Sequence, residues 1–377
     1  MIYLDNAATT RVSDVALDTV NDILKHNFAN PSSLYKLGLD SENLVTDARK
    51  SIAKILNCTP NEIYFTSCAT ESNNTAIYGA VKANARVGKK IVTSAVEHSS
   101  VVEPLKDLEN QGYDVVCIKP RDDGEFYADD FLAQIDDKTV LVSIIMINNE
   151  IGTIMPIEKI AKAVKQKNPQ TVVHIDATQG FCKYPINLKT LQADVVTASG
   201  HKIYAPKGVG FMYIRKGAKV KSLLLGGEQE FKFRAGTENT AFICAMAKSA
   251  SDTHSKMSQN FAHYKELKTY FLTLVENVSQ ISVNSTQNCV PYIVNFSVEG
   301  IRSEIMLHFL ESHEIYVSSG SACKKGAKSH VLEAMGKSAK QMDTAIRISF
   351  CPQTTKDEIK TLVDKLKLGI DTLVKTK

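Results

Sequence analysis

The sequence predicts an α/β protein, with a mostly parallel central sheet in a large domain and a smaller α+β domain. In the first half of the chain, helical patterns alternate with short apolar strands, as in βαβ units. The clearest strand, Val140 to Ile147, is nearly continuous in apolar residues, which is typical of a strand covered on both faces. At 377 residues the chain is long enough for two domains.

The individual elements follow from the spacing of apolar residues. Helices are expected at 14–26, at 35–56 and from Glu71 onward, and strands at 63–65, 91–93, 115–118, 140–147, 172–175 and 193–197. Residues 240–278 predict one long helix or two abutting helices, followed by a strand at 292–296, a helix at 303–311, a strand at 345–350 and a helix at 356–373. We place the large domain at 14–256, and the small domain at 1–13 and 257–377.

Composition narrows the class of protein. Lys and Arg total 45 against 41 Asp and Glu, and the net charge of +4 is too mild to make nucleic acid the main partner. No signal peptide is recognisable and no apolar run approaches the ~20 residues of a membrane span. The eight cysteines form no C-x-x-C pair, which gives neither a usual metal-site spacing nor a disulfide framework. We expect a cytoplasmic protein without a metal site or membrane contact.

A carboxylate and an amine follow two of the expected buried strands. Asp176 comes after the apolar run at 172–175, and Lys202 comes shortly after the run at 193–197. Parallel strands end at one edge of the sheet, so this layout suits pyridoxal phosphate: the lysine binds the aldehyde and the aspartate keeps the pyridine nitrogen protonated. A strand-end salt bridge is the alternative. A Gly/Ser-rich loop that presents Cys323 favours the cofactor.

Other polar residues fall at the same expected edge. The segment at 67–71, with Ala69 and Thr70, joins a strand to a helix start, where free N–H groups suit a phosphate or a simple helix cap. His98, Asn149 and Gln179 each follow a strand, and Ser199 and His201 immediately precede Lys202. A histidine at this position could stack on a cofactor ring and move protons.

Arg347 lies within an apolar strand between isoleucines, so its guanidinium needs a partner. A substrate carboxylate bound through two parallel hydrogen bonds is one candidate, and an internal ion pair is the other.

Taken together, the motifs resemble the cysteine desulfurases of the NifS/IscS class, a branch of the fold-type I pyridoxal-phosphate enzymes. The resemblance runs from residue 3 to about 352, in the same order and at compatible spacing. Its motifs are Tyr3-Leu-Asp-Asn-Ala-Ala-Thr-Thr10, Asn30-Pro-Ser-Ser33, Phe65-Thr-Ser-Cys-Ala-Thr-Glu71, Asn148-Asn-Glu-Ile-Gly152, Asp176-Ala-Thr-Gln179, Ser199-Gly-His-Lys202, Gly226-Gly-Glu-Gln-Glu230, Arg234-Ala-Gly-Thr-Glu238 and Ser318-Ser-Gly-Ser-Ala-Cys323.

The resemblance implies a role for each cofactor residue. Lys202 would carry the cofactor covalently and then shuttle the Cα proton, Asp176 would pair with the pyridine nitrogen, and His98 would stack on the ring. Gln179 would hydrogen-bond the phenolic oxygen. The phosphate would be held in a homodimer by residues of both subunits, namely Ala69, Thr70, Ser199 and His201 of one subunit and Thr237 of the other.

The resemblance also implies the reaction. Asn149 and Arg347 would bind the carboxylate of the substrate L-cysteine, and Cys323 would take its sulfur as a persulfide, leaving L-alanine. The persulfide would pass to a sulfur-acceptor protein, such as an iron–sulfur cluster scaffold or an enzyme of tRNA or cofactor thiolation. A mobile Gly/Ser loop suits that delivery, because an attacking thiolate must reach the cofactor and then carry sulfur outward.

The chain departs from the family pattern in three places. Cys68 and Cys351 stand where glycine is usual, and the loop after Cys323 is about two residues shorter than the commoner form. Lys324 and Lys325 follow the cysteine, and we hypothesise that their charge favours its thiolate; a solvated basic loop without effect is the alternative. Another fold-type I enzyme, such as a selenocysteine lyase or an aminotransferase, is the alternative function, and a non-catalytic scaffold is a more remote one.

Overall fold

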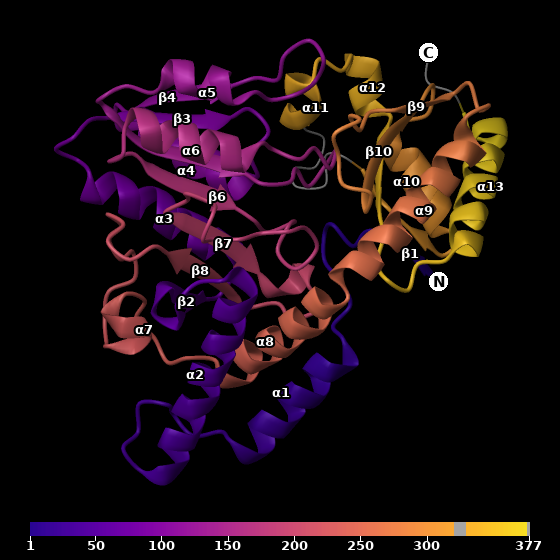
Figure 1. Ribbon diagram of the computed structural model, residues 1–377. Coiled ribbons are helices and arrows are strands. Elements are labelled where there is room, and N and C mark those ends of the chain that lie inside the picture. Colours follow the sequence, from indigo (N-terminus) through magenta and orange to yellow (C-terminus); the bar gives the residue numbers. More distant parts are fainter. Residues whose placement is uncertain (320–328, 375–377) are drawn as a thin grey trace.

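The computed structural model describes residues 1–319 and 329–374. Cys323 and the lysines that follow it therefore lie outside the described residues, and the hypotheses about them are not tested by the fold. Figure 1 shows a large part built around one sheet, and a smaller part formed mainly by the C-terminal third of the chain.

The large part is organised around a seven-stranded sheet with the strand order β2-β8-β7-β6-β5-β3-β4. All strand pairs from β7 to β4 are parallel, so the strand ends that follow β3, β5, β6 and β7 share one edge. The strands are β2 (Ile63–Thr66), β3 (Lys90–Ser94), β4 (Asp114–Ile118), β5 (Thr139–Ile145), β6 (Val172–Asp176), β7 (Val195–Ser199) and β8 (Gly210–Ile214).

Helices cover both faces of this sheet (Figure 1). Alternate residues of a strand enter different apolar clusters: Val195 packs with α3 and α4, whereas Val196 packs with the cluster that includes α5 and α6. The helices of the large part are α1 (Asp14–His26), α2 (Lys36–Leu56), α3 (Ala69–Ala83), α4 (Ser99–Asn110), α5 (Ala128–Gln134), α6 (Ile157–Lys167), α7 (Gln229–Lys232) and α8 (Thr240–Ser255), with the 3-10 turns η1 (Pro60–Glu62) and η2 (Gly200–Lys202).

The smaller part contains a four-stranded antiparallel sheet and a two-stranded ribbon. The N-terminal strand β1 pairs with β11, which brings the first residues of the chain to its C-terminal third. The remaining elements are β1 (Ile2–Tyr3), α9 (Met257–Val275), β9 (Ile281–Val283), β10 (Ile293–Val298), α10 (Ser303–Glu311), β11 (Ile315–Tyr316), β12 (Ser318–Ser319), α11 (His330–Ala334), α12 (Ala339–Asp343), β13 (Ala345–Ser349) and α13 (Lys356–Thr372).

Most of the predicted elements are confirmed to within two residues. Residues 240–278 form two helices, α8 and α9, which meet at Lys256. The helix predicted from Glu71 begins at Ala69. The strand β8, which lies antiparallel between β2 and β7, was not predicted from the sequence. Gly210–Ile214 is short, and no predicted helix precedes it to indicate another βαβ unit.

A buried ion pair joins α2 to the segment that contains α7. The Arg49 guanidinium donates to both carboxylate oxygens of Glu230, at 2.7 and 2.8 Å, and lies 4.9 Å from the ring centres of Phe65 and Phe231. Glu230 also accepts from the Phe65 N–H at 2.9 Å. Glu230, Phe231 and Lys232 all have positive φ, so these contacts hold a strained turn in place.

Replacing Arg49 with Met is expected to destabilise the fold by about 3–5 kcal/mol, because Glu230 would stay buried without its cation. The measurement is the free energy of unfolding in urea. The matched control is Lys50→Met at the next position along α2, which removes an exposed ion pair with Asp47. This variant is expected to change the free energy of unfolding by less than about 0.5 kcal/mol. Equal effects of the two variants would contradict a structural role for the buried pair.

Candidate functional site

The candidate site lies at the edge where β6 and β7 end side by side. Asp176 is the last residue of β6, Ser199 is the last residue of β7, and Lys202 ends the 3-10 turn that follows. Gly200 makes this turn possible, because an added Cβ would stand 2.9 Å from a Val209 methyl group. The predicted carboxylate and amine therefore come to one edge of the sheet from neighbouring strands.

The N-terminal segment closes over Lys202. The side-chain amine of Lys202 donates hydrogen bonds to the carbonyl oxygens of Ala7 and Ala8, both at 2.6 Å. The Gln179 amide donates to the same Ala7 carbonyl at 2.9 Å, and Tyr292 donates to the Gln179 carbonyl at 2.9 Å. Lys202 and Gln179 are thus held by one backbone group, which sequence reasoning could flag only through the motif at residues 3–10.

Asp176 is buried, and no cation within ion-pair distance belongs to the part of the chain that the structure describes. Its carboxylate accepts from the Asn73 amide at 2.7 Å and from the Thr178 backbone N–H at 2.9 Å. Both donors stabilise a negative charge. A buried carboxylate with hydrogen bonds but no counter-ion at a strand end suits a protonated ligand nitrogen.

His98 lies within electrostatic reach of Asp176 and Lys202, at the N-cap of α4. Burial lowers its pKa, and the charge of Asp176 opposes this effect, so the imidazole is neutral near pH 7. Nδ1 of the ring accepts a hydrogen bond from the Ser100 backbone N–H (3.2 Å) and lies 2.8 Å from the Ser100 hydroxyl. The fold therefore brings the three central predicted residues together.

A second group of polar atoms surrounds the start of α3. Ala69 is buried and Thr70 is exposed in the first turn of this helix, whose N-cap residue, Cys68, makes no capping side-chain bond, so the first N–H groups remain for an anion. The Ser199 hydroxyl is buried with no hydrogen-bond partner among the residues that the structure places. Burial and the charge of Lys202 lower the pKa of His201 to about 4, so this histidine is neutral and can donate or accept.

Cys68 does not close off this loop. Its thiol lies 3.6 Å from the Ser67 hydroxyl, and its backbone approaches Gly210, where an added Cβ would stand 3.0 Å from the Cys68 Cα. The backbone of Cys68 is extended, with a φ of −175° that any residue adopts, so a side chain in place of glycine causes no backbone strain.

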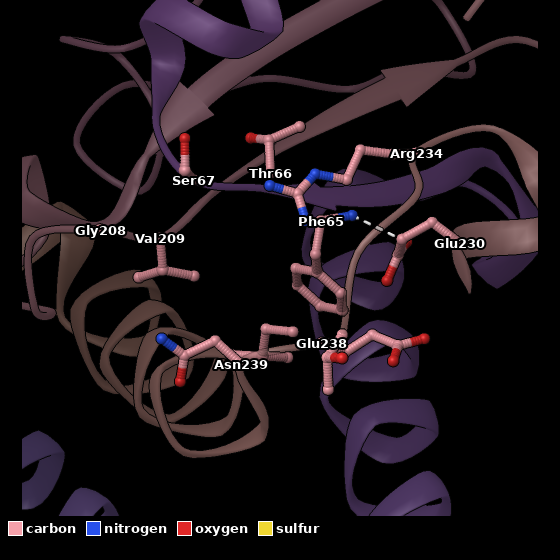
Figure 2. Close-up of a pocket in the computed structure, with 11 residues that line it drawn as sticks. Phe65, Thr66, Ser67, Gly208, Val209, Glu230, Arg234, Glu238 and Asn239 are labelled. Atoms are coloured by element: carbon pink, nitrogen blue, oxygen red, sulfur yellow. Dashed lines mark hydrogen bonds between the residues drawn. The ribbon is translucent and has the colours of Figure 1, made fainter. Parts of the chain in front are cut away.

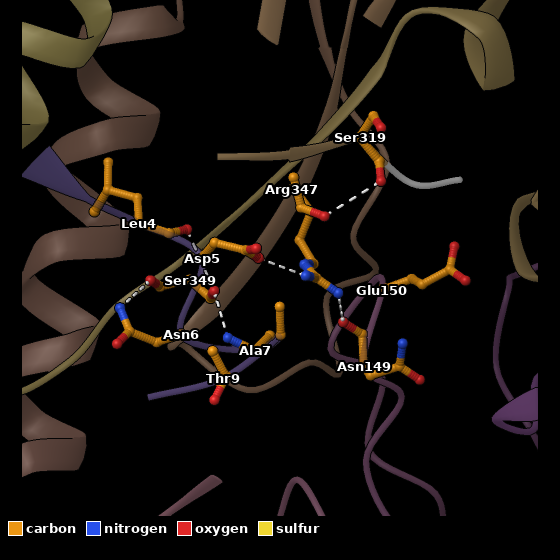
Figure 3. A network of polar contacts seen from close by, with 12 residues as sticks. Leu4, Asp5, Asn6, Ala7, Thr9, Asn149, Glu150, Ser319, Arg347 and Ser349 are labelled. Carbon is orange, nitrogen blue, oxygen red and sulfur yellow. Dashed lines mark hydrogen bonds and ion pairs between the residues drawn. The ribbon is translucent and has the colours of Figure 1, made fainter. Parts of the chain in front are cut away.

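Arg347 has internal partners, as one of the two sequence interpretations expected (Figure 3). It donates to the Asp5 carboxylate at 2.6 Å and to the Asn149 backbone carbonyl at 2.9 Å. Its Nε is buried without a partner among the residues that the structure places. The network brings Arg347 and Asn149 together, but through the Asn149 backbone and not its side chain. Sequence reasoning missed Asp5, whose only signal was its place in the N-terminal motif.

Thr237 lies in the segment between α7 and α8. It is exposed and lines a cavity of about 220 Å³ together with Ser67, Glu230 and Arg234 (Figure 2). Arg234 pairs with Glu71 at 2.8 Å, and so anchors the segment that carries Thr237 beside the start of α3.

Two buried ionisable residues near the site were not singled out from the sequence. Lys183 donates to the Gln179 side-chain carbonyl at 3.3 Å, and burial together with the charge of Lys202 lowers its pKa to about 7. Glu97 precedes His98 and is 1% exposed; burial raises its pKa to about 8. The Glu97 carboxyl accepts from the Ile145 backbone N–H at 2.9 Å, whereas its other oxygen has no partner among the described residues. Position was the only sequence signal: Glu97 directly precedes His98, and Lys183 lies four residues after Gln179.

The donors and acceptors at this edge fit pyridoxal phosphate. The buried Asp176 carboxylate suits the pyridine nitrogen, the Lys202 amine suits the aldehyde, and the unpartnered Ser199 hydroxyl beside the start of α3 suits the phosphate. Within the described residues there is no cluster of side chains that could hold a metal ion, and no helix long and apolar enough to cross a membrane.

Comparison with known proteins gives the class. The aminotransferase class-V family model matches residues 2–362, so the chain belongs to this family of pyridoxal-phosphate enzymes and has their type I fold. The chain is 38% identical to the cysteine desulfurase IscS of Dictyoglomus turgidum over 376 residues. The matched region covers 99% of this chain and 95% of that protein.

Solved structures agree with this assignment. A NifS-like protein superimposes with a TM-score of 0.94 at 33% identity, covering 99% of this chain and all of that one. The structure of SspA in complex with cysteine gives a TM-score of 0.82 at 31% identity, covering 94% of this chain and 100% of that one. Within the family, the protein is a pyridoxal-phosphate-dependent cysteine desulfurase, as the sequence motifs predicted.

Glu97→Gln is expected to make the stability of the apoprotein less sensitive to pH. The folded-state pKa of Glu97 is raised to about 8 from 4.5, so the folded protein keeps a proton that the unfolded chain loses, and stability falls as pH rises from about 4.5 to 8. Melting temperatures at pH 5 and pH 8 should show the variant gaining roughly a few degrees on the parent at the higher pH. The control is Glu42→Gln, which changes an exposed glutamate. A difference in melting temperature between Glu97→Gln and the parent that is the same at both pH values would contradict the prediction.

Proposed function

We propose that the residues at the β6–β7 edge carry out the desulfuration of L-cysteine in the roles that the family motifs imply. The observation that carries this proposal is the meeting of Asp176 and Lys202 at neighbouring strand ends, with His98 within reach of both. When bound, pyridoxal phosphate supplies an electron sink for the substrate Cα. Asp176 holds the pyridine nitrogen in its protonated form, and His98 covers the ring.

Lys202 and Gln179 would serve the aldehyde and the phenolic oxygen of the cofactor. The Lys202 amine carries the cofactor and then moves the proton at the substrate Cα. Gln179 donates to the phenolic oxygen, and Lys183 fixes the Gln179 amide from behind. The start of α3 would hold the phosphate, with Ala69, Thr70, Ser199 and His201 as its contacts.

Arg347 binds the substrate carboxylate with the help of Asn149. Asp5 and the Asn149 carbonyl already orient the guanidinium, which leaves its remaining N–H groups to face a carboxylate. Supporting this role, the Nε of Arg347 is buried without a partner among the described residues.

Cys323 accepts the sulfur. The Cys323 thiolate attacks the substrate sulfur, the C–S bond breaks, and an S–S bond forms on Cys323. The carbon fragment takes up a proton and leaves as L-alanine, so L-cysteine and one enzyme thiol become L-alanine and one enzyme persulfide. No further oxidant or reductant is needed.

Replacing Cys323 with Ala is expected to abolish alanine release from L-cysteine, by more than about a hundredfold, because no thiol remains to take the sulfur. The measurement is alanine formed per subunit, with the visible band of bound cofactor recorded alongside. The control is Cys117→Ala, which removes an exposed thiol on the edge strand β4. Full activity of the Cys323 variant with intact cofactor would contradict the assignment.

The active unit is proposed to be a homodimer. Apolar side chains are exposed on the loop between α1 and α2 (Phe28 and Leu34), on α2 (Leu39) and on the loop before α7 (Leu225). Exposed large apolar side chains of this kind are typical of a subunit interface. Thr237 of each subunit would complete the phosphate site of the other subunit.

A mixed dimer tests the role of Thr237 across the interface. Thr237→Glu and Lys202→Ala are each expected to be inactive as homodimers, the first through repulsion between carboxylate and phosphate. Co-expressed with two tags and purified as heterodimers, they should recover about half of the parent activity, because one site then combines an intact Lys202 with an intact Thr237. No recovery would mean that Thr237 acts within its own subunit.

The persulfide is proposed to pass to an acceptor protein, either an iron–sulfur cluster scaffold or an enzyme of tRNA or cofactor thiolation. We also propose a cytoplasmic location, which the seven free thiols among the described cysteines support. The division into a large domain at 14–256 and a small domain at 1–13 and 257–377 remains a proposal, supported by the pairing of β1 with β11.

A further inference from the structure

A chain of buried polar side chains crosses the central sheet beneath the site. It starts at Ser143 on β5, passes His174 on β6 and Thr197 on β7, and reaches Asn73 on α3; all four residues are 0% exposed. The Ser143 hydroxyl lies 2.9 Å from Nδ1 of His174, and Nε2 of His174 lies 3.2 Å from the Thr197 hydroxyl. That hydroxyl lies 2.5 Å from Oδ1 of Asn73.

The chain divides at Asn73. Its Nδ2 lies 2.7 Å from Oδ2 of Asp176 and 2.9 Å from the Ser100 hydroxyl, which in turn lies 2.8 Å from Nδ1 of His98. One amide group therefore contacts both the carboxylate proposed for the pyridine nitrogen and, through Ser100, the histidine proposed for the ring face.

The direction of each hydrogen bond in the chain follows from one fixed acceptor, the Asp176 carboxylate. The ionised Asp176 carboxylate can only accept, so the group of Asn73 that faces it is the NH₂, and Oδ1 of Asn73 must accept from Thr197. The Thr197 hydroxyl has only one proton, and it donates this proton to Asn73. Nε2 of His174 must therefore donate to Thr197, and Nδ1 of His174 accepts from Ser143.

The second branch is fixed in the same way. The Ser100 hydroxyl accepts from Asn73 and so donates its own proton to Nδ1 of His98. The Ser100 backbone N–H also points at that nitrogen, at 3.2 Å. Nδ1 of His98 is therefore an acceptor, and the proton of the neutral ring lies on Nε2. Burial lowers the pKa values of both His98 and His174, in agreement with neutral rings.

We propose that Asn73 is a positioning residue that couples Asp176 to His98, at the branch point of a hydrogen-bond chain whose donors all point toward the site. Successive donors polarise one another, so the chain strengthens the hydrogen bond that stabilises the Asp176 charge. It also fixes the tautomer of His98. The importance of this coupling for catalysis rests on the proposed function, because it needs Asp176 and His98 to face the cofactor.

The first test replaces Asn73 with Leu, which keeps the branched shape of the side chain and removes all three of its hydrogen bonds, to Asp176, Ser100 and Thr197. Affinity for pyridoxal phosphate, measured by titrating the apoprotein and following the visible band, should fall about tenfold to a hundredfold, as expected when a buried carboxylate loses an amide donor. The control is Asn84→Leu, a buried asparagine at the other end of α3, which should leave cofactor affinity unchanged.

The second test keeps the proposal open to refutation if Asn73→Leu does not fold. Thr197→Val is nearly isosteric and leaves the Asn73 oxygen without its donor, so cofactor affinity should fall in the same direction by about threefold to tenfold. Parent-like affinity in whichever of the two variants folds would overturn the proposal, because Asn73 would then serve packing alone.

The tautomer is tested without cofactor. In apoprotein labelled with ¹⁵N-histidine, the Nδ1 resonance of His98 should have the shift of an acceptor nitrogen. Ser100→Ala removes the hydroxyl donor but keeps the backbone N–H, so it should shift this resonance without protonating Nδ1. A protonated Nδ1 in the parent apoprotein would overturn the proposed chain. If the parent releases no alanine from L-cysteine while these results hold, the proposed function fails and the hydrogen-bond chain stands.

Discussion

The parallel pairing of β6 with β7 is the constraint on which the rest of the site depends. It brings the ends of two buried strands to one edge, so that Asp176 and the turn carrying Lys202 face a common space. Everything else in the site serves to hold groups against this edge. Helix α3 presents its N-terminus there, and α4 begins with His98 as its N-cap.

The N-terminal segment links this edge to the smaller part of the molecule. Asp5 pairs with Arg347 on β13, Ala7 accepts from Lys202, and the Ala7 N–H binds the hydroxyl of Ser349 at 2.7 Å. A few residues thus fix the distance between the amine that would carry the cofactor and the guanidinium that would bind the substrate carboxylate. A bridge of this kind explains why Leu4, Asn6 and Ala7 are buried.

The sequence allowed the α/β class, most of the elements and the family to be predicted, because apolar periodicity and local motifs depend on neighbouring residues. The contacts of Arg347 with Asp5 and of Asn73 with Asp176 could not be predicted, since each joins residues far apart in the chain whose types are individually unremarkable. Strand β8 was missed although Gly210–Ile214 contains residues that favour strands, because it is short and its place in the sheet depends on its antiparallel partners β2 and β7.

The electrostatic character of the site follows from what burial does to the groups around it. His98, His174 and His201 are neutral because burial lowers their pKa values. Burial also disfavours the charged form of Glu97 and raises its pKa, so this carboxyl keeps its proton below about pH 8. These neighbours are uncharged, and two backbone carbonyls hold the Lys202 amine, so no residue within the described parts of the chain forms an ion pair with Asp176. The fold thereby reserves its buried carboxylate for a ligand, and it does so with hydrogen bonds that stabilise the charge without neutralising it.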